Sequence, residues 1–117
     1  MEIQVKRVYE KPQKDDGRRI LVDRLWPRGL SREGAKIDRW AKEVSPSHEL
    51  RKWYGHEPAK WEEFRRRYFA ELAEKKAEVA QLRKEAAEGK VSLLYSSKEN
   101  ELNNATALKS YLEHSEK

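Results

Sequence analysis

The feature that most constrains the fold is a helical stretch between two short apolar segments. Residues 19–23 and 91–95 are apolar runs of strand length, which is typical of buried strands. Between them, large apolar side chains recur at spacings of three and four from Trp61 to Leu72, on one face of a helix. Strands separated by helices usually pair in parallel through right-handed crossovers. We therefore predict an α/β fold with a short, mostly parallel sheet.

The remaining elements follow from periodicity and turn residues. Residues 3–8 alternate apolar and polar side chains and predict a first strand. Residues 37–44 are ambiguous, because their apolar positions match helical spacing while their length suits a strand. Helices are expected at residues 47–55, 58–89 and 103–112, the second either continuous or broken near 75–76. The whole chain, residues 1–117, is thus predicted to be a small three-layer domain with three to four strands flanked by helices.

Composition limits the classes of function. The chain has 117 residues, 37% hydrophobic and 40% charged, which fits one domain with a modest core. Its net charge of +5 favours partners that carry phosphate or other anionic groups. The absence of cysteine excludes disulfides, thiolate metal sites and thiol nucleophiles. The three histidines lack the spacing of a helical zinc site, so we predict no metal and no cofactor.

The chain shows no feature of a membrane or exported protein. No apolar run approaches the roughly 20 residues that a membrane helix needs. The first residues contain no apolar stretch of the kind that a signal peptide requires. We therefore expect a cytoplasmic protein without a membrane partner.

Polar and basic residues gather after each predicted strand. In open parallel sheets, ligands usually bind beyond the carboxyl ends of the strands. The side chains there offer guanidinium and ammonium donors, hydroxyls and amides, which suit an anion or phosphate group. We therefore predict a ligand site built from these candidates: Arg7, Asp23, Arg24, Arg28, Gly29, Ser45, Ser47, Ser96, Lys98, Asn103 and Asn104. If chemistry follows binding, transfer or hydrolysis at the anionic group is expected, and whether the protein is an enzyme stays open.

Individual candidates carry different expectations. Arg28 with Gly29 is the sharpest pair, because arginine suits bidentate phosphate recognition and glycine permits close backbone approach. Asp23 is expected to form a structural ion pair with the adjacent Arg24. Ser96 has no neighbouring histidine in sequence, so a serine nucleophile is disfavoured.

Two alternatives come from other surface features. The basic run at residues 65–67 suggests a nucleic-acid-binding module, although it is most simply a solvated helix face. Exposed aromatic residues such as Trp53 or Trp61 would instead mark an interaction protein without a ligand of its own.

Several blocks of the sequence are similar to one known family. They are Lys-Arg-Val-Tyr at 6–9, Leu-Val-Asp-Arg-Leu-Trp-Pro-Arg-Gly at 21–29, Ser-Pro-Ser at 45–47, Glu-Leu-Arg-Lys at 49–52 and Leu-Leu-Tyr-Ser at 93–96, together with Asn103. They resemble the YeaO-like family, a group of domains of unknown function. The resemblance implies a single α/β domain over almost the whole chain and implies no particular activity.

The resemblance also bears on two positions. It implies a strand for about residues 37–44, which the periodicity leaves ambiguous. It further implies a histidine directly after Asn103, where this chain has Asn104. Asparagine can hydrogen-bond but does not titrate near neutrality, so an acid–base role at this position is weakened.

Overall fold

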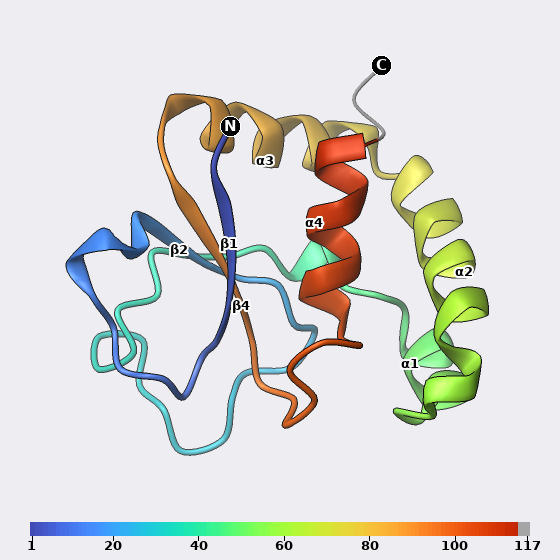
Figure 1. The fold of residues 1–117 in the computed structure, drawn as a ribbon. Helices are drawn as coiled ribbons and strands as arrows, with labels where there is room; N and C mark the ends of the chain where they lie inside the picture. The colour runs from blue at the N-terminus through green and yellow to red at the C-terminus, as the bar shows by residue number, and fades with distance from the viewer. Residues whose placement is uncertain (115–117) are drawn as a thin grey trace.

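The computed structural model describes residues 1–114. Over this range the chain forms a four-stranded sheet and four α-helices. Figure 1 shows how the labelled strands and helices are arranged. The strands are β1 (Ile3–Arg7), β2 (Arg18–Leu21), β3 (Arg39–Trp40) and β4 (Val91–Tyr95). The helices are α1 (His48–Tyr54), α2 (Trp61–Ala73), α3 (Lys76–Glu88) and α4 (Asn104–His114). Short 3-10 helices span Lys14–Asp16, Lys42–Val44 and Pro58–Lys60.

All strand pairs in the sheet are parallel, in the order β1-β4-β2-β3. The last strand along the chain, β4, lies inside the sheet between β1 and β2. Its partners are in register, with Ile3 opposite Val91 and Ile20 opposite Leu93. Every residue of β4 is buried, as expected for a strand covered on both faces. The predicted α/β class is confirmed.

The two faces of the sheet are covered by different structures. On one face, Ile20, Val22 and Leu93 belong to a hydrophobic cluster that includes buried residues of all four α-helices. On the opposite face, Leu21 and Leu94 pack in a second cluster with side chains from the chain that connects β2 to β3. Figure 1 shows the helices gathered on one side of the strands. In the described residues, the layer on the second face therefore consists of turns, loop segments and a short 3-10 helix rather than α-helices.

Several helix boundaries were predictable from capping residues. Ser47 caps α1 by accepting a hydrogen bond from the backbone of Leu50. Gly55 ends the same helix with φ of 53°, a left-handed conformation that glycine adopts without steric cost. The long helical stretch breaks into α2 and α3 between Ala73 and Lys76, as one of the two alternatives predicted.

The strand predicted for residues 37–44 is largely wrong. Only Arg39–Trp40 pairs with β2, and Lys42–Val44 forms a 3-10 helix instead. Ile37 and Val44 are buried in the two separate clusters that lie on opposite faces of the sheet. After Ala41, whose backbone N–H donates to Leu21, the chain turns to bring Val44 beneath the helices. The chain therefore leaves the strand conformation after Ala41, because Val44 is buried in the cluster under the helices.

A buried charge network fills the second face near the start of β2. The Asp16 side chain is nearly inaccessible, and its carboxylate accepts hydrogen bonds from Lys6 Nζ at 3.0 Å and Arg19 Nη1 at 2.6 Å. Gln4 Nε2 also donates to it, and Ser92 Oγ donates to the Asp16 backbone carbonyl at 2.7 Å. Asp16 thus links β1 and β2 through its carboxylate and β4 through its backbone carbonyl.

We predict that Asp16→Asn destabilises the fold by about 3–5 kcal/mol, because it leaves two buried cations without their counter-charge. The measurement is urea unfolding at neutral pH. Asp15→Asn is the matched control, since Asp15 is the exposed neighbour, and it should change stability by no more than about 0.5 kcal/mol. Equal effects of the two substitutions would contradict the role given to Asp16.

We also predict that the folding stability falls at acid pH because of the same carboxylate. Burial raises the pKa of Asp16, but hydrogen bonds from Gln13, Lys6, Gln4 and Arg19 outweigh it and lower the pKa from 3.8 to about 2. Its contribution to stability is therefore full above the unfolded-state value of 3.8 and is lost as the pH falls towards about 2. Unfolding measured across this range should show a pH dependence that Asp16→Asn reduces, and an unchanged profile in the variant would rule out Asp16 as its source.

Candidate functional site

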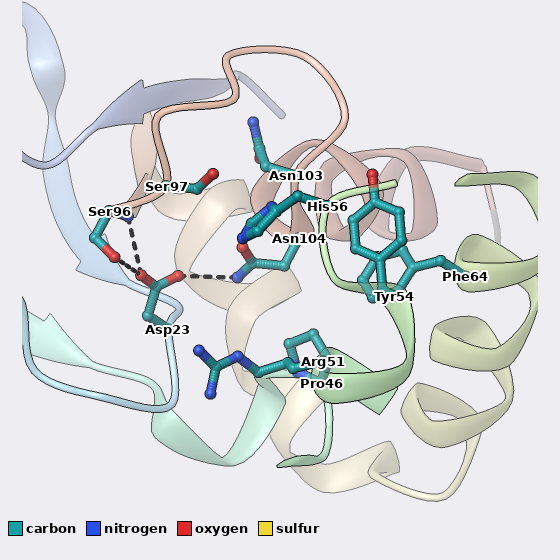
Figure 2. A pocket seen from close by; sticks show the side chains of 10 residues that line it. All are labelled: Asp23, Pro46, Arg51, Tyr54, His56, Phe64, Ser96, Ser97, Asn103 and Asn104. Atoms are coloured by element: carbon teal, nitrogen blue, oxygen red, sulfur yellow. Dashed lines mark hydrogen bonds between the residues drawn. The ribbon is translucent and has the colours of Figure 1, made fainter. Parts of the chain in front are cut away.

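Two adjoining hollows lie at the carboxyl edge of the sheet. The first, which we call the cavity, encloses about 140 Å³ and is shown in Figure 2. The second, which we call the open hollow, is a wider depression of about 440 Å³. Four residues line both of them: Asp23, Arg51, Ser96 and Ser97. They come from the segments after β2 and β4 and from α1, so the shared wall is assembled by the parallel pairing of the strands.

The Asp23 carboxylate organises this wall. Its Oδ2 accepts hydrogen bonds from the Ser96 backbone at 2.9 Å and from Ser96 Oγ at 2.7 Å. Its Oδ1 accepts from Asn104 Nδ2 at 3.0 Å, and the same amide donates to the Val22 carbonyl at 3.0 Å. Figure 2 shows Asp23 between these two partners. The carboxylate therefore ties the end of β2 to the end of β4 and to the first residue of α4.

The predicted ion pair between Asp23 and Arg24 is wrong. Arg24 Nε instead donates to the Pro46 carbonyl, at 3.4 Å. Both oxygens of Asp23 already accept hydrogen bonds from uncharged donors, Ser96 directly after β4 and Asn104 on α4. The adjacent arginine is consequently directed towards the segment before α1.

One wall of the cavity is aromatic. The rings of Tyr54 and Phe64 are stacked, with centroids 4.4 Å apart and an angle of 26° between their planes. Both residues are buried, and the Tyr54 hydroxyl donates to the Leu102 carbonyl at 2.9 Å. Burial, assisted by the negative charge of Glu99, raises the pKa of Tyr54, so this hydroxyl stays protonated at neutral pH. Tyr54 thus contributes an uncharged aromatic side chain to the wall of the cavity.

Asn103 and Asn104 have different roles at the cavity. Asn103 caps α4, because its Oδ1 accepts from the Thr106 backbone at 2.9 Å while its Nδ2 donates to the Glu99 carbonyl. Asn104 uses its Nδ2 for the contact with Asp23. Within residues 1–114, no donor reaches its Oδ1, which leaves that oxygen as an acceptor on the lining of the cavity.

The open hollow is lined by cations from four separate segments: Arg7, Arg28, Arg51 and Lys98. In the part of the chain that the structure describes, none of these four forms a salt bridge. Arg7 Nε donates to the Ser97 carbonyl at 2.9 Å, and its guanidinium lies 4.7 Å from the centre of the Tyr9 ring. The lining therefore combines these four cations with the single carboxylate of Asp23, which pairs with none of them in the described residues, and its net charge is positive.

The structure brings most of the predicted candidates together. Arg7, Asp23, Arg28, Ser96 and Lys98 line the open hollow, while Asp23, Ser96, Asn103 and Asn104 line the cavity. The other four candidates, Arg24, Gly29, Ser45 and Ser47, line neither. Of these, Ser45 Oγ donates to the Lys42 carbonyl, and Ser47 caps α1 and contacts Glu71.

Arg51, Tyr54 and Phe64 line the site but were not among the candidates. Tyr54 and Phe64 lie in regions predicted to be helical, where a large apolar side chain indicates packing against the core. Arg51 had one usable signal, because it follows the predicted cap Ser47 by one helical turn and so lies near a strand end. The same segment is part of the blocks on which the family resemblance rests.

The described residues offer little for metal chemistry. Among residues 1–114 there is no group of three or more histidine, aspartate or glutamate side chains arranged to hold a metal ion. In the same range, no helix is long and apolar enough to cross a membrane. The cavity and the open hollow are lined by hydrogen-bond donors, hydrogen-bond acceptors and aromatic side chains.

Comparison with known proteins places the chain in a family. Residues 2–117 match the family model described as "Inactive DUF488-N3 subclade". The chain belongs to this DUF488-N3 subclade. The uncharacterized protein YeaO of Escherichia coli K12 is 45% identical over 112 residues, covering 96% of this chain and 97% of YeaO. The predicted YeaO-like relationship is therefore confirmed.

Mycobacterial members extend the comparison. The uncharacterized protein Rv3073c of Mycobacterium tuberculosis H37Rv is 48% identical over 82 residues, which is 70% of this chain and 69% of that protein. The uncharacterized protein Mb3100c of Mycobacterium bovis matches to the same extent. No solved structure matches the chain.

We predict that Ser96→Ala destabilises the protein by about 1.5–3 kcal/mol, because it removes a hydrogen bond to the charged Asp23 carboxylate. Ser97→Ala is the matched control. Among the described residues, Ser97 Oγ accepts from the backbone of Glu99 alone, a neutral contact worth about 0.5–1.5 kcal/mol. Chemical denaturation of both variants measures the difference. A smaller loss for Ser96→Ala than for Ser97→Ala would show that Asp23 does not organise the wall.

Proposed function

We propose that this protein binds a phosphate-bearing or other anionic small molecule in the open hollow and does not convert it chemically. The observation that carries the proposal is the convergence of Arg7, Arg28, Arg51 and Lys98 on one surface without carboxylate partners in the described chain. Guanidinium groups bind oxyanions through paired, charge-assisted hydrogen bonds. The adjacent Ser97 hydroxyl can add a single uncharged hydrogen-bond donor.

The contrast with the other basic residues supports this assignment. Arg19, Arg39 and Arg66 each contact a carboxylate oxygen at 2.6 Å. Their charges are thus neutralised locally, whereas the charges around the open hollow are not. Arranging several like charges without counter-ions costs free energy, and an anionic ligand would remove that cost.

Three features favour binding over turnover. The subclade that matches this chain is described as inactive. At position 104, where the family resemblance implies histidine, the chain has an asparagine that cannot exchange protons near neutrality. The nearby carboxylate of Asp23 already accepts three hydrogen bonds, so its oxygens are engaged in holding the wall. These features support a binding role.

The basic run at residues 65–67 does not favour nucleic acid as a second function. Arg65 pairs with Glu62, and Arg66 and Arg67 both contact Glu63. Their positive charge is largely compensated on the helix itself. Nucleic-acid binding therefore stays a prediction. A cytoplasmic location, suggested by the lack of cysteine, is likewise a proposal.

Arg28→Ala should abolish the stabilisation of the protein by inorganic phosphate while leaving the fold intact. Arg28 is exposed, so its removal should change stability by only about 0.5 kcal/mol. Loss of a charge-assisted contact to the anion should cost about 1.5–3 kcal/mol of binding. The measurement is the shift in unfolding temperature with increasing phosphate, since a ligand that binds only the folded state raises stability.

Two controls sharpen this test. Arg28→Lys keeps the charge but removes the planar fork, so it should retain only part of the phosphate effect. Lys84→Ala removes one exposed positive charge on α3, away from both hollows, and should leave the effect unchanged. If wild-type protein gains no stability from phosphate, or if Lys84→Ala loses as much as Arg28→Ala, the proposed site is wrong. Binding of RNA or DNA in the absence of phosphate binding would favour the alternative.

A further inference from the structure

We propose, on the basis of the function proposed above, that the ligand is an ester in which an oxyanion group such as phosphate is attached to one small ring. Its oxyanion would lie in the open hollow among Arg7, Arg28 and Lys98. Its ring would lie in the cavity against Tyr54 and Phe64. This assignment names the chemical class of the ligand, which a cationic surface alone does not determine.

The first argument is that the two hollows adjoin each other. Asp23, Arg51, Ser96 and Ser97 line both, so a ligand that contacts these residues from the open hollow lies next to the cavity. Arg51 extends from α1 at this junction, and in the described part of the chain it has neither a salt bridge nor a side-chain hydrogen bond. It can therefore contact an oxyanion that enters from the open hollow while the attached group occupies the cavity.

The second argument is the shape and chemistry of the cavity. Its volume of about 140 Å³ is close to the roughly 150 Å³ of an engineered apolar cavity that holds one benzene molecule. The cavity lining includes the stacked aromatic residues Tyr54 and Phe64, and an aromatic wall favours packing of a ring. The free Oδ1 of Asn104 and the hydroxyl of Ser97 can hydrogen-bond to substituents on that ring. One small ring thus fits the space and the lining.

The third argument is the size and rim of the open hollow. At about 440 Å³ it falls within the usual range of small-molecule sites, and it is much larger than a bare phosphate requires. Its rim contains Leu25, which is 63% exposed, and Tyr9, which is 40% exposed. Large apolar side chains exposed beside unpaired cations are better suited to an organic anion than to an inorganic ion.

The test compares two phosphate monoesters that differ in the ring. Phenyl phosphate carries it, and methyl phosphate has the same anionic group without it. Calorimetry on the wild-type protein should give an affinity for phenyl phosphate at least about tenfold higher, because the ring buries apolar surface. In amide NMR spectra, both esters should shift signals near Arg28 and Lys98. Only phenyl phosphate should shift those of Tyr54, His56 and Asn104.

The outcomes separate this inference from the function on which it rests. Equal affinities, with shifts confined to the open hollow, would overturn the ring site and leave anion binding standing. Failure of both esters and of inorganic phosphate to bind would overturn the proposed function, and the inference with it. An affinity difference without shifts at the cavity residues would also sink the inference, because the ring would then bind elsewhere.

Variants provide an independent check. Phe64→Leu keeps an apolar wall but removes a ring, so it should reduce the preference for phenyl phosphate while methyl phosphate binds as before. Arg51→Ala should weaken both esters several-fold, and Lys52→Ala, the exposed neighbour on the same helix, should weaken neither. If Phe64→Leu impairs folding, the NMR comparison on the wild-type protein still decides the question. A Phe64→Leu protein that folds and keeps the full preference would contradict the proposal.

Discussion

The structure depends on the parallel insertion of β4 between β1 and β2. Because every strand runs in the same direction, each connection must cross from one end of the sheet to the other. The connection between β3 and β4 contains α1, α2 and α3, whose buried residues join those of α4 in one cluster on a single face. The same geometry brings the ends of β2 and β4 side by side. The residues that follow them, Asp23 and Ser96, can then meet although they are 73 positions apart in the chain.

Two carboxylates at opposite ends of β2 are satisfied in different ways. Asp16, before the strand, is buried and compensated by the cations Lys6 and Arg19. Asp23, after the strand, takes its hydrogen bonds from a backbone amide, a hydroxyl and a side-chain amide, all of them uncharged. This difference has a consequence for function. The carboxylate at the site end does not consume a cation, so the arginines around the open hollow keep their positive charge available for a ligand.

Local patterns in the sequence predicted much of the fold and part of the site. Alternation, helical spacing and capping residues such as Ser47 and Gly55 placed most elements, because these signals are local. The short β3 was misjudged because Ile37 and Val44 pack on opposite faces, a tertiary demand that no local pattern contains. The predicted parallel topology places the residues that follow the strands at one edge of the sheet, and Arg28, Ser96 and Lys98 do line one hollow there. Arg51 and Tyr54 line the site because of how α1 packs, which no local pattern contains. The partners of Asp23 were also missed, because the adjacent Arg24 was expected to pair with it and contacts Pro46 instead.

The account stands on one claim, that the carboxyl edge of the sheet is an anion site. The most direct measurement is a crystal structure of the wild-type protein soaked in phosphate, compared with a crystal free of phosphate and sulfate. We predict a phosphate within hydrogen-bonding distance of Arg28 and of at least one of Arg7, Arg51 and Lys98. Absence of an anion from the open hollow, or a phosphate found only at the paired arginines of residues 65–67, would contradict the claim.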